Sequence, residues 1–192
     1  MGEAPLSWPD GNDRVPYWIY TDQGNYEREL EKIFYGPVWN YVGLECEIPN
    51  PGDFKRTQIG DQSIIVVRDA EGGVNALVNR CAHRGVKICE QDKGSFSEIM
   101  CPYHQWTYDL KGNLQGVPFH RGVKGNGGMP ADFSMADNGL DVLKVHVRNG
   151  GIFATMSDKT PPFETYMGNR ILGYYDRELD GRSLSLLGHS RQ

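Results

Sequence analysis

Cys81-Ala82-His83 and Cys101-Pro102-Tyr103-His104 are two short segments, separated by residues 84–100, and each joins one cysteine to one histidine. We call them clip 1 and clip 2. Thiolate sulfur and imidazole nitrogen are ligands of transition metals, so two such segments can bring four ligands to one place. The sequence therefore predicts a metal centre held by Cys81, His83, Cys101 and His104.

The order of the ligands along the chain distinguishes between two kinds of metal centre. Zinc sites with two cysteines and two histidines usually group Cys with Cys and His with His, whereas each clip mixes the two types. A Rieske [2Fe–2S] cluster has two cysteines on one iron and two histidines on the other. The mixed clips favour this cluster and therefore an electron-transfer protein, and a zinc-stabilised structural module is the alternative from another class.

Residues beside the clips are expected to surround the cluster. Arg84 and Gly85 would let backbone N–H groups point at cluster sulfur atoms, and Arg84 could also help to dock an acidic partner. Trp106 and Tyr108 could shield the cluster or donate hydrogen bonds to its sulfur atoms, although ordinary core residues would give the same pattern. The full set expected around the ligands is Arg84, Gly85, Tyr103, Gln105, Trp106 and Tyr108.

The clips also carry a family resemblance. Cys81-Ala82-His83-Arg84-Gly85 and Cys101-Pro102-Tyr103-His104-Gln105-Trp106-Thr107-Tyr108 resemble the cluster motif of Rieske non-haem-iron aromatic-ring-hydroxylating oxygenases, specifically of their large (α) subunit. Residues 14–16, 38–54 and 115–119 are similar to the subgroup that acts on aromatic carboxylates such as salicylate, anthranilate and terephthalate, the salicylate 5-hydroxylase type in particular. The resemblance extends from about Arg14 onward.

The resemblance implies a path for electrons. An NADH-dependent reductase, with or without a separate ferredoxin, would reduce the cluster, which would pass single electrons to a mononuclear Fe(II) that hydroxylates a salicylate-like aromatic carboxylate with O2. It also implies α3 or α3β3 assemblies, in which the electron crosses to a neighbouring α subunit. A freestanding Rieske ferredoxin is the runner-up, and it would need only about the central part of the chain.

The mononuclear iron site of the family is not recognisable in the sequence. Such a site uses two histidines and one carboxylate, but His120, His146 and His189 do not belong to a D-x2-H-x4–5-H arrangement. These three histidines are expected to be structural or exposed. We therefore expect no catalytic residue in this chain and no hydroxylation by the chain alone, because the Fe(II) would lie in a catalytic domain that begins near Tyr166 and continues beyond Gln192.

Composition excludes several classes of partner. A net charge of −5 gives no basic face for nucleic acid or an anionic membrane. The longest aliphatic run, residues 64–67, is far shorter than the roughly 20 residues of a membrane span, and the N-terminus lacks the pattern of a signal peptide. These features predict a cytoplasmic protein, in which Cys46 and Cys89 would remain free thiols.

The expected fold is mainly β: an antiparallel β-sandwich or barrel, with the clips on two hairpin loops at one end. We expect an N-terminal arm and helix (1–37), a Rieske domain (38–156) and the start of a catalytic domain (157–192). In the first part, residues 1–24 would be extended and Asn25 would cap a helix over residues 26–34. The clearest strands are expected at residues 53–59, 63–68, 73–79, 105–109, 140–148 and 151–155.

Two further segments are expected to lie outside the core. The glycine-rich residues 122–130 lack the pattern of a phosphate-binding loop, so they are expected to form a surface excursion. Residues 183–188, with Leu184, Leu186 and Leu187, have the pattern of a strand. If its sheet partners lay outside the chain, this strand would present an unpaired edge and favour self-association or disorder.

Overall fold

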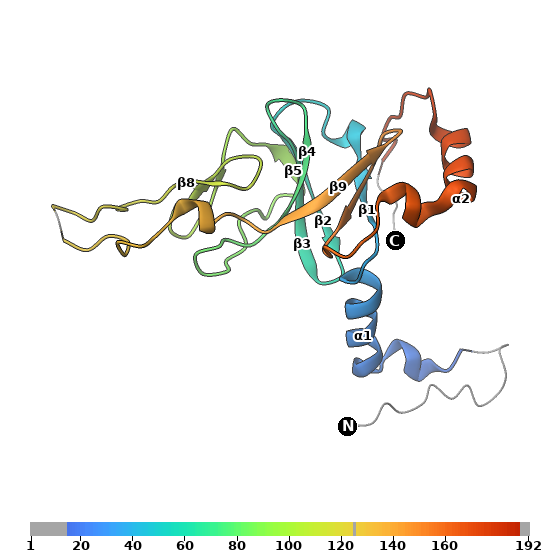
Figure 1. Cartoon of the computed structure of the whole chain (residues 1–192), viewed down its shortest axis with the longest axis horizontal. Coiled ribbons are helices and arrows are strands. Elements are labelled where there is room, and N and C mark those ends of the chain that lie inside the picture. The colour runs from blue at the N-terminus through green and yellow to red at the C-terminus, as the bar shows by residue number, and fades with distance from the viewer. Residues whose placement is uncertain (1–14, 125, 189–192) are drawn as a thin grey trace.

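The computed structural model of the chain describes residues 15–124 and 126–188. Within these residues, the expectation of a mainly β fold is confirmed: ten strands form two antiparallel sheets, and α-helices occur only near the two ends (Figure 1). The larger sheet is curled and has the strand order β1 (Asn40–Leu44), β10 (Gly151–Thr155), β9 (Val142–Arg148), β4 (Val74–Val78), β3 (Gln62–Arg68), β2 (Asp53–Ile59) and β5 (Lys93–Ser95). The smaller sheet consists of β6 (Ile99–Met100), β7 (Thr107–Tyr108) and β8 (Leu114–Gly116).

Strand β3 is buried on both faces and separates two hydrophobic cores. Successive side chains of a strand point to opposite faces, so the four aliphatic residues 64–67 contribute alternately to each core. Ile65 and Val67 pack in the core that also contains Cys81 and Cys101, whereas Ile64 and Val66 pack in the core on the other face. The cysteines of both clips are therefore part of the same core as the central strand.

Two turns of the same construction flank the clips along the chain. In the turn between β3 and β4, the Asp69 carboxylate accepts hydrogen bonds from the backbone N–H groups of Glu71 and Gly73 and from the Asn75 side chain. In the turn between β7 and β8, the Asp109 carboxylate accepts the equivalent bonds from residues 111, 113 and 115. The first turn directs β4 into clip 1, and the second follows the strand that leaves clip 2.

The N-terminal helix differs from the expectation in its start and in its last turn. Helix α1 spans Gln23–Glu29, and its N-cap is Asp22, whose carboxylate accepts the backbone N–H of Asn25 at 2.8 Å. Asn25 is thus inside the first turn and not the cap. Residues Leu30–Phe34 form a π-helical turn, η2, which ends with a bond from the Tyr35 N–H to the Leu30 carbonyl.

Five of the ten strands lie at or close to their expected positions. The expected strands at 53–59 and 151–155 have the bounds of β2 and β10, and those at 63–68, 73–79 and 140–148 differ from β3, β4 and β9 by one or two residues at an end. The expected strand at 105–109 is reduced to β7. Strands β1, β5, β6 and β8 were not predicted, because β5, β6 and β8 are two or three residues long and β1 contains an irregularity between Tyr41 and Gly43.

Helix α2 (Phe163–Leu179) lies against the turn between β9 and β10 and is interrupted at Gly168, where φ is 69°. Before this break Phe163 is buried against Phe153 and Trp39. After it, the Asp176 carboxylate accepts bonds from Arg148 and Asn149, and the Tyr175 hydroxyl donates to the Arg148 carbonyl at 3.0 Å. The helix is therefore attached to the sheet on both sides of the break.

The expectation of a strand at residues 183–188 is wrong. Residues 182–188 form no regular structure, and the Leu184 side chain lies against Gly150 in the β9–β10 turn. The argument for an unpaired strand edge there consequently has no basis. The described residues of the glycine-rich segment, 122–124 and 126–130, lie in a surface excursion, as expected, and residues 117–124 and 126–139 belong to a long arm that projects from one end of the molecule (Figure 1).

Residues 1–14, which include most of the expected extended arm, and His189 lie outside the described residues. In the described part of the arm the expectation of extended chain is wrong at two places, because Tyr17–Tyr20 form a 3-10 helix, η1, and residues 23–24 belong to α1. In the part that is described, none of the helices has the length and apolarity that crossing a membrane requires.

The two aspartate turns test how burial changes the contribution of the same hydrogen bonds to the free energy of unfolding. Asp69 is buried, whereas the bonds of Asp109 are exposed to solvent. We expect Asp69→Ala to lower the free energy of unfolding by about 2 kcal/mol, because it removes a buried acceptor and leaves three partly buried donors unpaired, and Asp109→Ala, the matched control, to lower it by less than about 1 kcal/mol. Urea denaturation measures both, and equal losses would contradict the argument.

The same turn predicts a pH dependence. Burial alone would raise the pKa of the Asp69 carboxyl, but the hydrogen bonds from Asn75, Gly73 and Glu71 hold that pKa below its usual value. A carboxyl with a lowered folded-state pKa contributes stability that is complete above its ordinary pKa and is lost as the pH falls through the lowered value. As the pH decreases, the free energy of unfolding should therefore fall less steeply in Asp69→Asn than in the wild type.

Candidate metal centre

Both clips lie in loops that are closed by the same pair of backbone hydrogen bonds. In loop 81–86, the Cys81 N–H donates to the Val86 carbonyl and the Gly85 N–H donates to the Cys81 carbonyl, each at 2.8 Å. In loop 101–106, the Cys101 N–H donates to the Trp106 carbonyl at 2.8 Å and the Gln105 N–H donates to the Cys101 carbonyl at 3.0 Å. Two different sequences thus adopt one loop geometry.

The fifth residue of each loop has a left-handed backbone conformation, with φ of 71° at Gly85 and 56° at Gln105. Glycine adopts this conformation without strain, whereas a residue with a side chain is disfavoured there. Gln105 therefore retains a strained backbone immediately after His104.

The expected placement of the clips on two hairpin loops is correct for clip 2 only. Clip 2 connects β6 to β7, which pair with each other. Clip 1 follows β4 and lies in the long connection to β5, and β5 pairs with β2 at the edge of the larger sheet. This connection is fixed by Asn79, a buried residue that the sequence reasoning did not single out.

Asn79 uses both ends of its side chain. Its amide donates to the Cys89 carbonyl at 2.7 Å and to the Ser63 hydroxyl at 3.1 Å, and its carbonyl accepts the N–H groups of Ile88 and Cys89. These bonds hold the chain after clip 1 against β3. The sequence did offer a signal for this role: Asn79 is a polar residue at the end of an apolar strand, two residues before the predicted ligand Cys81.

The four predicted ligands are brought together as two pairs. The ring centroids of His83 and His104 are 4.6 Å apart, and the Cys101 thiol is close enough to Cys81 to affect its pKa. Both cysteines are buried, with exposed fractions of 2% and 1%, whereas both histidines are half-buried. In the described part of the chain, no three His, Cys, Asp or Glu side chains are grouped around a point where one metal ion could sit. Cysteine faces cysteine, and histidine faces histidine.

Tyr108 contacts the cysteine pair from inside the core. Its hydroxyl lies 3.2 Å from the Cys81 sulfur and accepts the Ala82 N–H at 3.2 Å. Burial raises the pKa of the Cys81 thiol, while the Tyr108 hydroxyl and the His83 backbone N–H oppose this and the Cys101 thiol adds to it. Burial and the adjacent Cys81 raise the pKa of Tyr108, which stays protonated and can donate to a thiolate.

His83 has the features of a metal ligand. Its Nδ1 atom is buried and has no hydrogen-bond partner, a condition shared among the described side chains only with the Asn25 amide nitrogen. Burial, His104 and Arg84 lower the pKa of the His83 imidazole, which favours the neutral form that binds metals. Two thiols, two imidazoles and an orphaned ring nitrogen fit a [2Fe–2S] cluster with mixed ligands.

Aromatic rings cover the two histidines unequally. Trp106 is buried and stacks on His83, with centroids 4.6 Å apart and planes at 6°, and Phe133 from the projecting arm meets Trp106 edge-on. Tyr103 packs on His104 at 3.8 Å but is itself 59% exposed. Sequence reasoning identified Trp106 and Tyr108 and missed Phe133, which lies far from the clips along the chain. Arg84 and Gln105 are exposed, at the surface beside the histidines.

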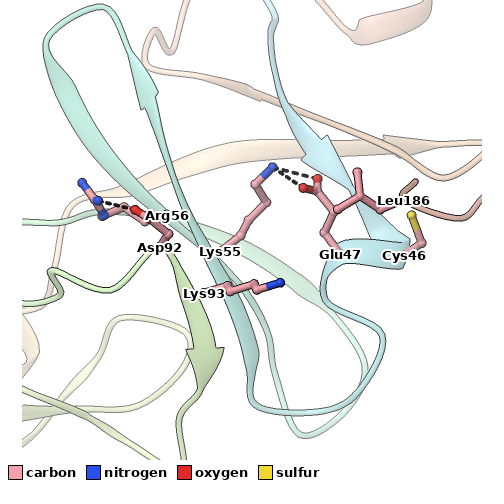
Figure 2. A pocket seen from close by; sticks show the side chains of 7 residues that line it. All are labelled: Cys46, Glu47, Lys55, Arg56, Asp92, Lys93 and Leu186. Carbon is pink, nitrogen blue, oxygen red and sulfur yellow. Dashed lines mark hydrogen bonds and ion pairs between the residues drawn. The ribbon is translucent and has the colours of Figure 1, made fainter. Parts of the chain in front are cut away.

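Other expected candidates lie elsewhere. His146 stacks on Phe163, and His120 packs against Phe133. Cys46 and Cys89 are free thiols. Cys46 lines a pocket of about 500 Å³ at the β2–β5 edge, shown in Figure 2, together with Glu47, Lys55, Arg56, Asp92, Lys93 and Leu186. None of these residues belongs to a clip, and Lys55 and Arg56 are paired with Glu47 and Asp92.

Comparisons with known proteins agree with the pattern of the clips. Residues 38–126 match the family model described as the Rieske [2Fe–2S] domain. The chain is 54% identical over 96% of its length to the large oxygenase component of salicylate 5-hydroxylase from a Ralstonia species, and 47% identical over 95% to the anthranilate 1,2-dioxygenase large subunit of Burkholderia cepacia.

The fold comparison gives the same result. A quaternary ammonium Rieske monooxygenase, described with carnitine oxidation and inter-subunit electron transfer, superposes with a TM-score of 0.71 and 25% identity, over 83% of this chain and 41% of that one. The chain spans less than half of the two curated relatives, 45% and 43% of their lengths. Both relatives are oxygenase subunits, which favours the oxygenase expectation over a freestanding ferredoxin or a zinc module.

The equivalent loop positions predict opposite effects of two substitutions. A Cβ at Gly85 would have its nearest contact, Arg80, at 3.8 Å, so Gly85→Ala should cost only the backbone strain, about 1–2 kcal/mol. Gln105→Gly should relieve the same strain and stabilise the protein by about 0.5–1 kcal/mol. Chemical denaturation of both variants measures the two changes, and changes of the same sign would show that the loops are not equivalent.

The Tyr108 hydroxyl should influence the reduction potential of a bound cluster. A hydrogen bond to the Cys81 sulfur stabilises the more negative, reduced state, so we expect Tyr108→Phe to lower the midpoint potential. If the bond favours reduction by about 1 kcal/mol, the decrease is about 40 mV for one electron. Tyr103→Phe is the matched control, because it removes only the hydroxyl of an exposed tyrosine and retains the ring that packs on His104. Redox titration followed by visible absorption distinguishes the two, and a potential unchanged in Tyr108→Phe would rule out the role.

Proposed function

Residues 38–126 form a Rieske [2Fe–2S] domain, and from this we propose that the chain is the electron-transfer part of a ring-hydroxylating oxygenase large subunit. The observation that carries the proposal is the arrangement of the clips, with two buried thiols in one pair and two half-buried imidazoles in the other. When bound, a cluster of this type supplies one-electron oxidation and reduction.

In this proposal Cys81 and Cys101 would hold one iron of the cluster, and His83 and His104 would hold the other. Burial of the cysteines excludes water from the thiolates, and Tyr108 supports one of them with its hydroxyl. The histidines remain at the surface, where their outer ring nitrogens can form hydrogen bonds with a partner protein. Trp106 fixes the plane of His83 by stacking on it. Arg84, Gly85, Tyr103 and Gln105 complete the surroundings of the cluster.

We propose the activity of the complete protein by analogy with its relatives. The relatives are large subunits of enzymes named for salicylate and anthranilate, which supports an aromatic carboxylate as the substrate and O2 as the oxidant. A reductase or ferredoxin would supply the electrons. The Rieske part would extend over residues 38–156, and residues 157–192 would begin the domain that holds the mononuclear Fe(II). The described residues of this chain contribute no catalytic group to that step.

We also propose that the cluster exchanges electrons with another subunit. The similar quaternary ammonium monooxygenase is described with inter-subunit electron transfer, and the histidine pair here lies at the surface and not in the interior. A trimer of large subunits, with or without β subunits, would bring such a surface to a neighbouring copy. The unpaired thiols of Cys46 and Cys89 support a cytoplasmic location, where thiols stay reduced.

Metal analysis tests the proposal directly. The purified chain should contain two irons and two acid-labile sulfides per polypeptide. After reduction with dithionite its electron paramagnetic resonance spectrum should have an average g value below that of all-cysteine [2Fe–2S] clusters, because nitrogen replaces sulfur on one iron.

Variants at cysteines distinguish the site from adventitious iron. Cys101→Ser should lose both iron and sulfide, whereas Cys46→Ser, a matched substitution outside the clips, should retain both. Stoichiometric zinc without sulfide in the wild type would refute the cluster and leave the structural zinc module.

A further inference from the structure

The turn between β7 and β8 contains a glycine that packs closely against the larger sheet. A Cβ atom at Gly112 would lie 3.0 Å from the Cδ2 atom of Leu77 and 3.2 Å from the Cγ2 atom of Val142. The Gly112 carbonyl also accepts the N–H of Leu140 at 2.8 Å, which fixes the turn to the chain that enters β9. Leu77 lies in β4 and is fully buried, so it cannot move aside, whereas Val142 is exposed. A side chain at position 112 would therefore push the turn away from β4.

This close contact lies near the one between Tyr108 and clip 1. Leu77 is four residues before Cys81, and Gly112 is four residues after Tyr108, whose hydroxyl is 3.2 Å from the Cys81 sulfur. The segments 77–81 and 108–112 thus meet at both of their ends. Strand β7 contains Tyr108, follows clip 2 directly and pairs with β6, so the turn belongs to the sheet that carries clip 2. A displacement of the turn would therefore also move Tyr108 relative to Cys81.

The turn between β3 and β4 allows a direct comparison, because Gly72 occupies the position of Gly112 there. Each glycine N–H donates to the carbonyl of the aspartate three residues earlier, at 3.1 Å for Gly72 and 3.0 Å for Gly112. Their φ angles are 87° and 88°, so alanine would strain both backbones alike. Among the described residues, however, none beyond the chain neighbours lies within 4 Å of a Cβ at Gly72. The two glycines share a backbone conformation and differ in the space around them.

We propose that Gly112 is a positioning residue for the redox centre, because its close packing on Leu77 sets the distance between the smaller sheet and β4. This distance brings the Tyr108 hydroxyl to the Cys81 sulfur. The inference rests on the proposed function, since Cys81 would hold one iron of the cluster. A hydrogen bond to the sulfur stabilises the reduced state, which carries the larger negative charge. The packing of a turn outside the clips thereby adjusts the reduction potential of the centre.

The test is the midpoint potential of the cluster-containing protein in two glycine-to-alanine variants. We expect Gly112→Ala to lower the potential, in the direction expected for Tyr108→Phe, because the hydroxyl moves away from the sulfur. Gly72→Ala, the matched control, should keep the wild-type potential, because it has the same backbone strain and free space for the methyl group. Redox titration followed by visible absorption measures both variants.

A double variant shows whether Gly112 acts through Tyr108. The hydroxyl is already absent in Tyr108→Phe, so the addition of Gly112→Ala should lower the potential no further. A decrease that adds to the decrease in Tyr108→Phe would mean that the alanine affects the cluster by another route. That result would overturn the role proposed for the turn.

A second double variant tests the contact with Leu77. Leu77→Val removes the Cδ2 atom that the new Cβ would meet, so Gly112→Ala combined with Leu77→Val should regain the potential of Leu77→Val alone. If Gly112→Ala by itself yields no folded protein, recovery of folded, cluster-containing protein in the double variant supports the contact. A double variant that keeps the lowered potential, or that fails to fold although Leu77→Val folds, overturns it.

The outcomes separate this inference from the proposed function. Equal midpoint potentials in the wild type, Gly112→Ala and Gly72→Ala overturn the role of Gly112 and leave the cluster and its electron transfer in place. A wild-type protein that assembles no cluster overturns the proposed function and this inference with it.

Discussion

The convergence of four side chains from two loops depends on the way each loop closes on its own backbone. In loops 81–86 and 101–106 the cysteine uses both its N–H and its carbonyl within the loop. This closure fixes the cysteine and the histidine two or three residues later as one rigid unit. Asn79 then holds the segment after the first loop against β3, and the Tyr108 hydroxyl contacts both Cys81 and Ala82. The geometry of the site is thus set by hydrogen bonds within the polypeptide.

The division of the site into an inner and an outer half follows from its position at the end of one hydrophobic core. The cysteines belong to the core that includes Ile65 and Val67, whereas the histidines are beyond its last layer, between Trp106 and Tyr103. A low-dielectric environment around the thiolates and an accessible imidazole edge are therefore consequences of the same packing. This combination suits a centre whose sulfur atoms are shielded from water and which can still exchange electrons with a protein.

The sequence was most informative where chemistry is local. The four candidate ligands could be singled out because their spacing and type restrict the possible metals, Trp106 and Tyr108 because they follow the second clip, and β3 and β10 because their apolar patterns are strong. The short strands β5, β6 and β8 could not, since pairing partners and not intrinsic preference define strands of two or three residues. Phe133 was missed because its contact with Trp106 depends on the path of a long arm. The supposed strand at 183–188 was wrong because alternating leucines also suit a segment that packs on a turn.

Helix α2 is attached to the larger sheet at more than one place. Gly151 leaves no room for a side chain, because a Cβ there would meet the Tyr175 hydroxyl at 2.0 Å. Phe163 packs on the sheet before the Gly168 break and Asp176 is bonded to Arg148 after it, so both halves of the interrupted helix are attached. The two attachments therefore hold both halves of α2 against the β9–β10 turn and fix the place at which the polypeptide leaves the β structure.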